Sequence, residues 1–131
     1  MISLYPSEHE EQKMLMAWSK VMESRLPKLR LLHSTPNGGD RHPATAVKLK
    51  AEGVKAGVPD LCLPVAMKDY HGLFIEMKKK RGGRLSPEQK QWRDDLEAEG
   101  YQVVVCHGFD EARDAILNYL ASPDRKEGGR P

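Results

Sequence analysis

Apolar and polar residues follow a helical period over the first part of the chain. From Ser7 to about Arg25, apolar residues recur at the spacing that places them on one face of an α-helix. Ser7 is a good N-cap, and Glu10 stands three residues later, where it completes a capping box. Pro27 should end this helix, because proline cannot continue one. The pattern thus predicts an amphipathic first helix with a defined start and end.

Four short apolar runs, by contrast, predict strands. They cover residues 29–33, 61–65, 73–78 and 101–106. The polar segment 68–72, which separates the second and third runs, ends in a glycine, as the turn of an antiparallel hairpin does. Pro64 inside the second run indicates an edge strand or a bulge, since proline has no N–H to donate to a neighbouring strand.

Three more helices are expected, over residues 44–52, from Pro87 to near Gly100, and over residues 109–120. The helix between the hairpin and the last strand makes these strands parallel. The expected fold class is therefore α/β, a mixed β-sheet flanked by helices in the order αβαββαβα. Residues 1–121 form a single domain, and the polar, Gly- and Pro-rich residues 122–131 form a flexible tail.

The predicted hairpin brings two acids and a lysine to its open end. If the pairing centres on the turn, Asp60 lies about opposite Glu76, while Glu76 and Lys78 share one face of their strand. Burying these charges is unfavourable unless something binds there. Two adjacent carboxylates hold a hard divalent cation such as Mg²⁺ or Mn²⁺, and the backbone carbonyl of Met77 can add an oxygen.

Such a centre suits hydrolysis of a phosphodiester. A bound metal lowers the pKa of water and neutralises charge that develops on a phosphate. Lys78 can orient or deprotonate the water, or stabilise the developing charge, and the sequence does not decide between these roles. The three residues therefore predict a metal-dependent enzyme.

Three stretches around this site, residues 53–60, 74–78 and 82–89, carry a family resemblance. Pro59-Asp60 is followed, after fifteen residues, by Glu76-Met77-Lys78. With this spacing, the three stretches resemble the virus-type replication-repair nuclease (VRR-NUC) family of the PD-(D/E)xK superfamily. The resemblance runs from about Ser7 to about Leu120 and implies a restriction-endonuclease-like core. It also implies a standalone phage or bacterial endonuclease that cleaves branched DNA, is similar to Holliday-junction resolvases and acts as a homodimer.

The resemblance extends to residues outside this cluster. Members of the family resemble a Glu-x-x-x-Gln pattern in the first helix, with the Glu near the metal; Glu8 and Gln12 match it, and Glu11 is the rival. Without the resemblance, the simpler interpretation is that these acids stabilise the positive end of the helix dipole at the N-terminus. Gln89 is implied to lie near the site, although with Ser86 it also fits a capping box at the start of its own helix. Asn37 belongs to a loop that lines the site in the family.

A basic loop follows Lys78. Its cations are Lys79, Lys80, Arg81 and Arg84. Directly after a metal site, such a loop is well placed to hold a DNA backbone, although outside this context it would be an ordinary solvated loop. Since the net charge of the 131 residues is only +2, any affinity for DNA must come from local patches of this kind.

Composition excludes other classes of protein. No apolar run is long enough to span a membrane, and the first twenty residues contain acids rather than a signal pattern. Cys62 and Cys106 lie inside predicted strands without a second Cys or His at ligand spacing, which indicates reduced thiols and no zinc site. We therefore expect no membrane partner and a cytoplasmic location, which the resemblance places in a bacterial cell or a phage-infected host.

Three alternatives to the structure-selective nuclease stay open. A non-catalytic DNA-binding module would keep the basic loop but would not need the cluster of Asp60, Glu76 and Lys78. An α/β scaffold would treat these residues as a surface ion-pair cluster. A restriction-type nuclease would cut linear duplex with sequence preference, whereas this chain shows no module for reading bases.

Overall fold

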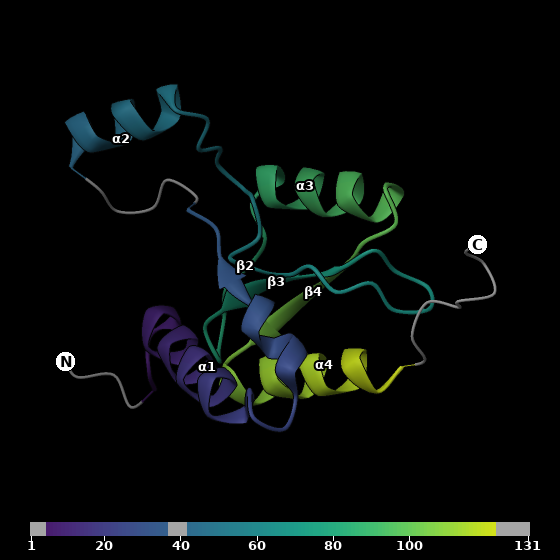
Figure 1. Ribbon diagram of the computed structural model, residues 1–131. Helices are drawn as coiled ribbons and strands as arrows, with labels where there is room; N and C mark the ends of the chain where they lie inside the picture. The colour runs from purple at the N-terminus through teal and green to yellow at the C-terminus, as the bar shows by residue number, and fades with distance from the viewer. Residues whose placement is uncertain (1–4, 37–41, 123–131) are drawn as a thin grey trace.

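The computed structural model describes residues 5–36 and 42–122, which fold into three layers. A four-stranded sheet in the order β1-β2-β3-β4 forms the middle layer, with α3 on one face and α1 and α4 on the other (Figure 1). The helices are α1 (Glu8–Met22), α2 (Pro43–Ala51), α3 (Pro87–Ala98) and α4 (Phe109–Ala121); the strands are β1 (His33–Ser34), β2 (Leu61–Leu63), β3 (Leu73–Lys78) and β4 (Gln102–His107). The α/β class predicted from the sequence is confirmed.

Both predicted capping boxes are present. At the start of α1, Ser7 Oγ accepts a hydrogen bond from the backbone N–H of Glu10, and Glu10 Oε1 accepts one from the backbone N–H of Ser7. Ser86 and Gln89 make the same reciprocal pair at the start of α3. These bonds satisfy N–H groups that have no partner inside the helix, so both helices begin where the sequence predicted.

The strand predicted over residues 29–33 is wrong. Pro27–Leu31 forms a 3₁₀ helix, and only His33–Ser34 pairs with β2. Pro27 occupies the first turn of this helix, where its fixed φ suits a helical backbone and its missing N–H is not needed. Leu29 is buried, and its carbonyl oxygen accepts a hydrogen bond from Ser19 of α1 rather than from a strand. The leucines of this segment therefore belong to a short 3₁₀ helix that packs against α1.

The hairpin has the predicted register. Leu61 pairs with Ile75 and Leu63 with Leu73 in antiparallel orientation, and this register places Asp60 across from Glu76. Strand β2 ends at Leu63, so the exposed Pro64 follows the strand instead of interrupting it. The β3–β4 pair is parallel, as the helical connection requires.

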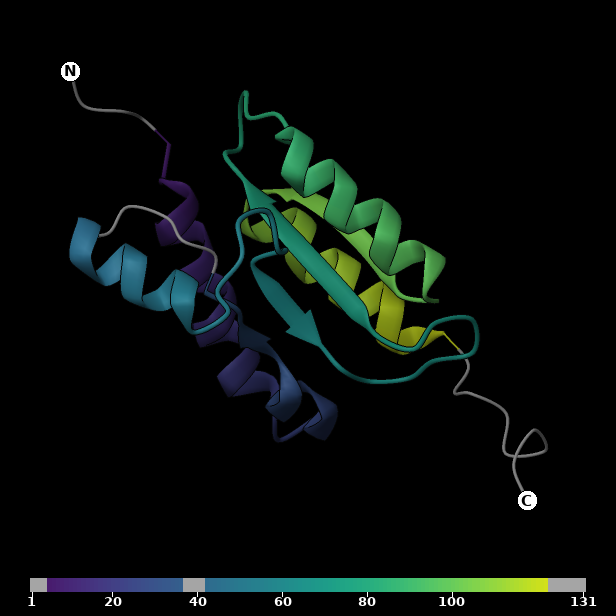
Figure 2. The ribbon, with the colours of Figure 1, turned by 90° about the horizontal axis from the view of Figure 1, so that it is seen from above.

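The two faces of β3 have different roles, since one packs in the core and the other carries residues of the candidate site. Leu73, Ile75 and Met77 point into the core, which α1 and α4 cover through residues such as Leu15 and Ile116. Because side chains alternate along a strand, Glu76 and Lys78 point to the opposite face, toward α3. Seen from above, α3 runs across this side of the sheet (Figure 2). One strand thus contributes both to the core and to the candidate site.

The remaining predictions concern the second helix, the two cysteines, membrane spans and the C-terminal tail. Helix α2 stands apart from the sheet, and none of its residues is buried (Figure 1). Cys62 is half-buried and Cys106 is buried, and both are free thiols. Within the described ranges, no helix is both long enough and apolar enough to cross a membrane. Apart from Ser122, the predicted tail 122–131 lies outside the described residues.

Candidate active site

Asp60 and Glu76 meet at the open end of the hairpin. Asp60 directly precedes β2, and its Oδ2 accepts a hydrogen bond of 2.7 Å from the backbone N–H of Met77 in β3. Glu76 is 4% exposed, and its Oε1 is buried without a hydrogen bond from any of the described residues. Two carboxylates therefore share a confined space, and one of the four oxygen atoms lacks a donor.

The surroundings of Glu76 disfavour its negative charge. Burial, together with the charge of Asp60, raises the pKa of Glu76 from 4.5 to about 9; Lys78 opposes this shift, and Glu8 adds to it. A carboxylate under such strain gains most from a cation at its unpaired oxygen. The donor set consists of hard oxygen atoms, so the site fits Mg²⁺ or Mn²⁺ rather than a softer metal.

The backbone of Met77 can supply a further oxygen. In an extended strand, the N–H and C=O of one residue point to the same side. Since the N–H of Met77 bonds to Asp60, its carbonyl also faces the gap that lies before the first residue of β2. In the described part of the chain, no three His, Cys, Asp or Glu side chains come together to hold a metal. A metal here would therefore need backbone or water oxygens as well, which is usual for Mg²⁺.

Gln89 connects the lysine to the acid. Its Oε1 accepts a hydrogen bond of 3.0 Å from Lys78 Nζ, and its Nε2 donates one of 3.0 Å to Glu76 Oε2. The same Oε1 accepts from the backbone N–H of Ser86, so the capping role and the place near the site occur together. Lys78 Nζ also lies 4.0 Å from Glu76 Oε2, and Lys78 is 9% exposed. The amide of Gln89 thus fixes both charged groups.

The structure separates the two acids of the first helix. Glu8 is half-buried, and its charge adds to the rise in the pKa of Glu76. Glu11 is 1% exposed, and its Oε1 accepts a hydrogen bond of 2.8 Å from the backbone N–H of Phe109. Glu11 therefore caps α4, whose own N-cap residue is Gly108 and has no side chain for this purpose. Sequence reasoning missed this role, although the helical spacing of Glu11 and the buried Leu15 was a signal.

We expect Glu11→Ala to lower the free energy of unfolding by about 1–3 kcal/mol, because it removes a buried helix cap. Urea denaturation followed by circular dichroism would measure this loss. Asp114→Ala removes an exposed acid of α4 that pairs with Arg113 at the surface, and it should change stability by less than about 0.5 kcal/mol. Equal stability of the two variants would contradict the capping role of Glu11.

Comparison with known proteins identifies this geometry. The VRR-NUC domain model matches residues 2–110. The chain belongs to the VRR-NUC family. A solved structure described as a "VRR_NUC domain protein" is 36% identical to it and superposes with a TM-score of 0.79, over 93% of this chain and 94% of that chain. None of the curated proteins compared with the chain matches it. The family resemblance predicted from the sequence is confirmed, and the family is one of nucleases, whose substrate is DNA.

The basic loop of this VRR-NUC domain is exposed. All four predicted DNA-binding cations of the loop are open to solvent: Lys79, Lys80, Arg81 and Arg84. They lie between the last residue of β3 and the start of α3, the two elements that carry Lys78 and Gln89. Asn37, the other predicted DNA contact, lies outside the described residues. The loop is thus placed to meet a DNA backbone beside the carboxylates.

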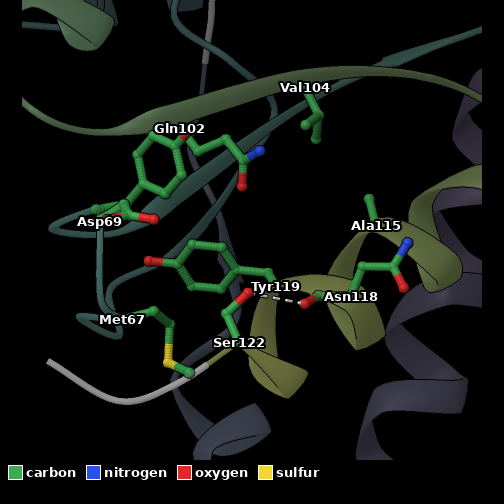
Figure 3. Close-up of a pocket in the computed structure, with 9 residues that line it drawn as sticks. Met67, Asp69, Gln102, Val104, Ala115, Asn118, Tyr119 and Ser122 are labelled. Atoms are coloured by element: carbon green, nitrogen blue, oxygen red, sulfur yellow. Dashed lines mark hydrogen bonds between the residues drawn. The ribbon is translucent and has the colours of Figure 1, made fainter.

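A different hollow of the VRR-NUC domain, shown in Figure 3, has a volume of about 340 Å³ and lies between α4 and the sheet. Gln102, at the start of β4, and Tyr119 of α4 contribute to its lining. Glu76, in contrast, is paired with Val105 farther along β4, toward the other end of the strand. Asp69 is the single carboxylate among the lining residues, so this hollow lacks the paired acids of the nuclease site.

Proposed function

We propose that this VRR-NUC protein is a Mg²⁺- or Mn²⁺-dependent endonuclease that hydrolyses phosphodiester bonds in branched DNA, such as a Holliday junction. The observation that carries this proposal is the buried Glu76 carboxylate, which lies across from Asp60, has one oxygen without a donor, and connects through Gln89 to Lys78. A scaffold protein would gain nothing from burying these charges, whereas a metal-binding nuclease requires them.

Each residue of the cluster has a role that follows from its position. Asp60, Glu76 and the Met77 carbonyl would hold the metal, and Glu8 would act as a further acid nearby rather than as a third side-chain ligand. When bound, the metal supplies a water of lowered pKa and neutralises charge on the phosphate. Lys78 Nζ is held by Gln89 on the face that carries Glu76. From there it can donate to the attacking water or to a phosphate oxygen, which stabilises the developing charge.

Selectivity for branched DNA is supported by what the protein presents to its substrate. Its net charge is +2, and the cations of the loop after β3 are exposed side chains suited to phosphates rather than to base edges. Recognition should therefore depend on the shape of the DNA backbone. As a homodimer, the protein would present two sites related by a two-fold axis, as two symmetric cuts in a junction require.

The test is cleavage of a labelled four-way junction, a linear duplex and a single strand in Mg²⁺, Mn²⁺ or EDTA. We expect metal-dependent cutting that favours the junction and that Asp60→Ala abolishes. Asp69→Ala removes an exposed acid of the hairpin turn and should cut like the wild type. Equal cutting of all three substrates would overturn the selectivity, and no cutting in either metal would overturn the nuclease. Light scattering on and off the junction would measure the oligomeric state.

A further inference from the structure

A second cleft lies beside the catalytic cluster. It has a volume of about 590 Å³ and is formed by the segment before and at the start of α1 together with the loop after β3. Its walls combine one aromatic ring with three cations and one acid, from the residues Tyr5, Pro6, Ser7, Glu10, Lys79, Lys80 and Arg81. An aromatic ring next to several cations is the combination with which proteins hold single-stranded nucleic acid.

The chain connects this cleft directly to the site. Ser7 immediately precedes Glu8, and Lys79 immediately follows Lys78, so both walls continue into residues of the cluster. The cleft is therefore adjacent to the cluster along the chain, where α1 begins and β3 ends.

Tyr5 and Arg81 form the aromatic part of the cleft. The guanidinium carbon of Arg81 lies 5.2 Å from the centre of the Tyr5 ring, and the Tyr5 side chain remains accessible, with 44% of its surface exposed. An aromatic ring and a guanidinium plane both stack on nucleobases, and stacking does not depend on the identity of the base.

The charges that line the cleft favour one orientation of a bound nucleotide. Glu10 lies on the α1 wall, and its hydrogen bonds with Ser7 lower the pKa of its carboxyl group, so it stays negative at neutral pH. Lys79 and Lys80 lie on the opposite wall and are exposed. A phosphate is therefore attracted to the lysine wall and repelled from the α1 wall, which leaves the base beside Tyr5.

We infer that this cleft binds one unpaired nucleotide next to the scissile phosphate, with its base stacked on Tyr5 and its phosphate against Lys79 and Lys80. A base inside a duplex is already paired and stacked, so only a nucleotide released from the helix can occupy the cleft. The inference rests on the proposed nuclease function and narrows its substrate class. Among branched DNAs, the cleft favours those with an unpaired nucleotide at the branch point.

The test measures binding without cleavage. Fluorescence anisotropy in EDTA would give the Kd of the wild type, Tyr5→Ala and Tyr5→Phe for a flap and for a continuous duplex of the same length. We expect Tyr5→Ala to weaken binding of the flap by about 5- to 100-fold and to leave duplex binding within about twofold, because stacking of one base is lost. Tyr5→Phe keeps the ring and should bind both probes like the wild type.

A lysine variant is the second control, after Tyr5→Phe. Lys79→Ala should weaken binding of both probes and reduce the salt dependence of binding, because it removes a phosphate contact. Equal effects of Tyr5→Ala on the binding of flap and duplex, or no effect on either, would overturn the inference that the cleft binds an unpaired nucleotide. This readout does not depend on the metal. If the flap is bound selectively but no DNA is cut, the cleft stands and the nuclease function fails; if DNA is cut without the Tyr5 effect, the reverse holds.

Discussion

Glu76→Gln should abolish DNA cleavage and yet, in EDTA, unfold at a higher temperature than the wild type. Loss of a metal-binding carboxylate should lower the cleavage rate by about three orders of magnitude or more. The same substitution removes a carboxyl group that is 4% exposed, faces Asp60 and has to take up a proton for the protein to fold at neutral pH. Gln is nearly the same size and neutral, so the metal-free fold should gain on the order of 2 kcal/mol at neutral pH.

The pH dependence follows from the direction of the shift. Because burial and Asp60 raise the pKa of Glu76 from 4.5 to about 9, the folded protein keeps this proton at pH values where the unfolded chain has lost it. The folded state therefore binds more protons over this range, and wild-type stability in EDTA should fall as the pH rises from about 4.5 to about 9. Mg²⁺ should reduce the fall, since it binds the ionised folded form.

Thermal melts of both proteins between pH 5 and pH 9, with and without Mg²⁺, would measure these effects. Glu97→Gln neutralises an exposed acid of α3 and should retain the wild-type dependence on pH. If Glu76→Gln melted below the wild type throughout, or if both proteins showed the same slope with pH in EDTA, Glu76 would not be the strained carboxylate described above.

Gly57→Ala should cause a larger loss of stability than Glu11→Ala. Gly57 has a φ of 92°, and a Cβ at this position would lie 2.7 Å from the backbone carbon and the Cβ of Glu88 in α3. Both the strained backbone and the collision with a helix disfavour alanine, so the free energy of unfolding should fall by about 2–4 kcal/mol. Cleavage should fall as well, because the loop carries Asp60 and α3 carries Gln89.

A second glycine of the same loop separates these two effects. Gly53 has a φ of 107°, but a Cβ there would meet nothing within 4 Å. Gly53→Ala should therefore show only the backbone strain, about 1 kcal/mol, and should leave cleavage close to that of the wild type. Urea denaturation and junction cleavage would compare the variants. Equal losses in both would show that the contact with Glu88 does not position the site.

The sequence predicted the elements whose signals are local. The capping boxes at Ser7 and Ser86 depend on residues three positions apart, and the register of Asp60 and Glu76 depends on one turn. The segment 29–33 was misassigned because its leucines fit a strand as well as the 3₁₀ helix that follows Pro27.

Contacts between distant segments were beyond this reasoning. Glu8 and Glu11 look alike in the sequence, and they differ only because Glu11 reaches the backbone of Phe109, 98 residues away. The contact between Gly57 and Glu88 is of the same kind, since neither residue signals it alone. Pattern and spacing therefore proposed the members of the site, but the hydrogen bond from Phe109 to Glu11 could not be predicted from the sequence.

Gln89 takes part both in the first turn of α3 and in the cluster, so the stability of this turn affects the candidate site. Its side chain closes the first turn of α3 and also holds Lys78 and Glu76. Helix ends are the parts of a helix that open first, and each opening of this turn releases the lysine and the acid in the same event. Hydrogen exchange at the start of α3 therefore reports the fraction of molecules whose active site is assembled. Opening of this one helical turn would therefore separate Lys78 from Glu76 without unfolding of the rest of the domain.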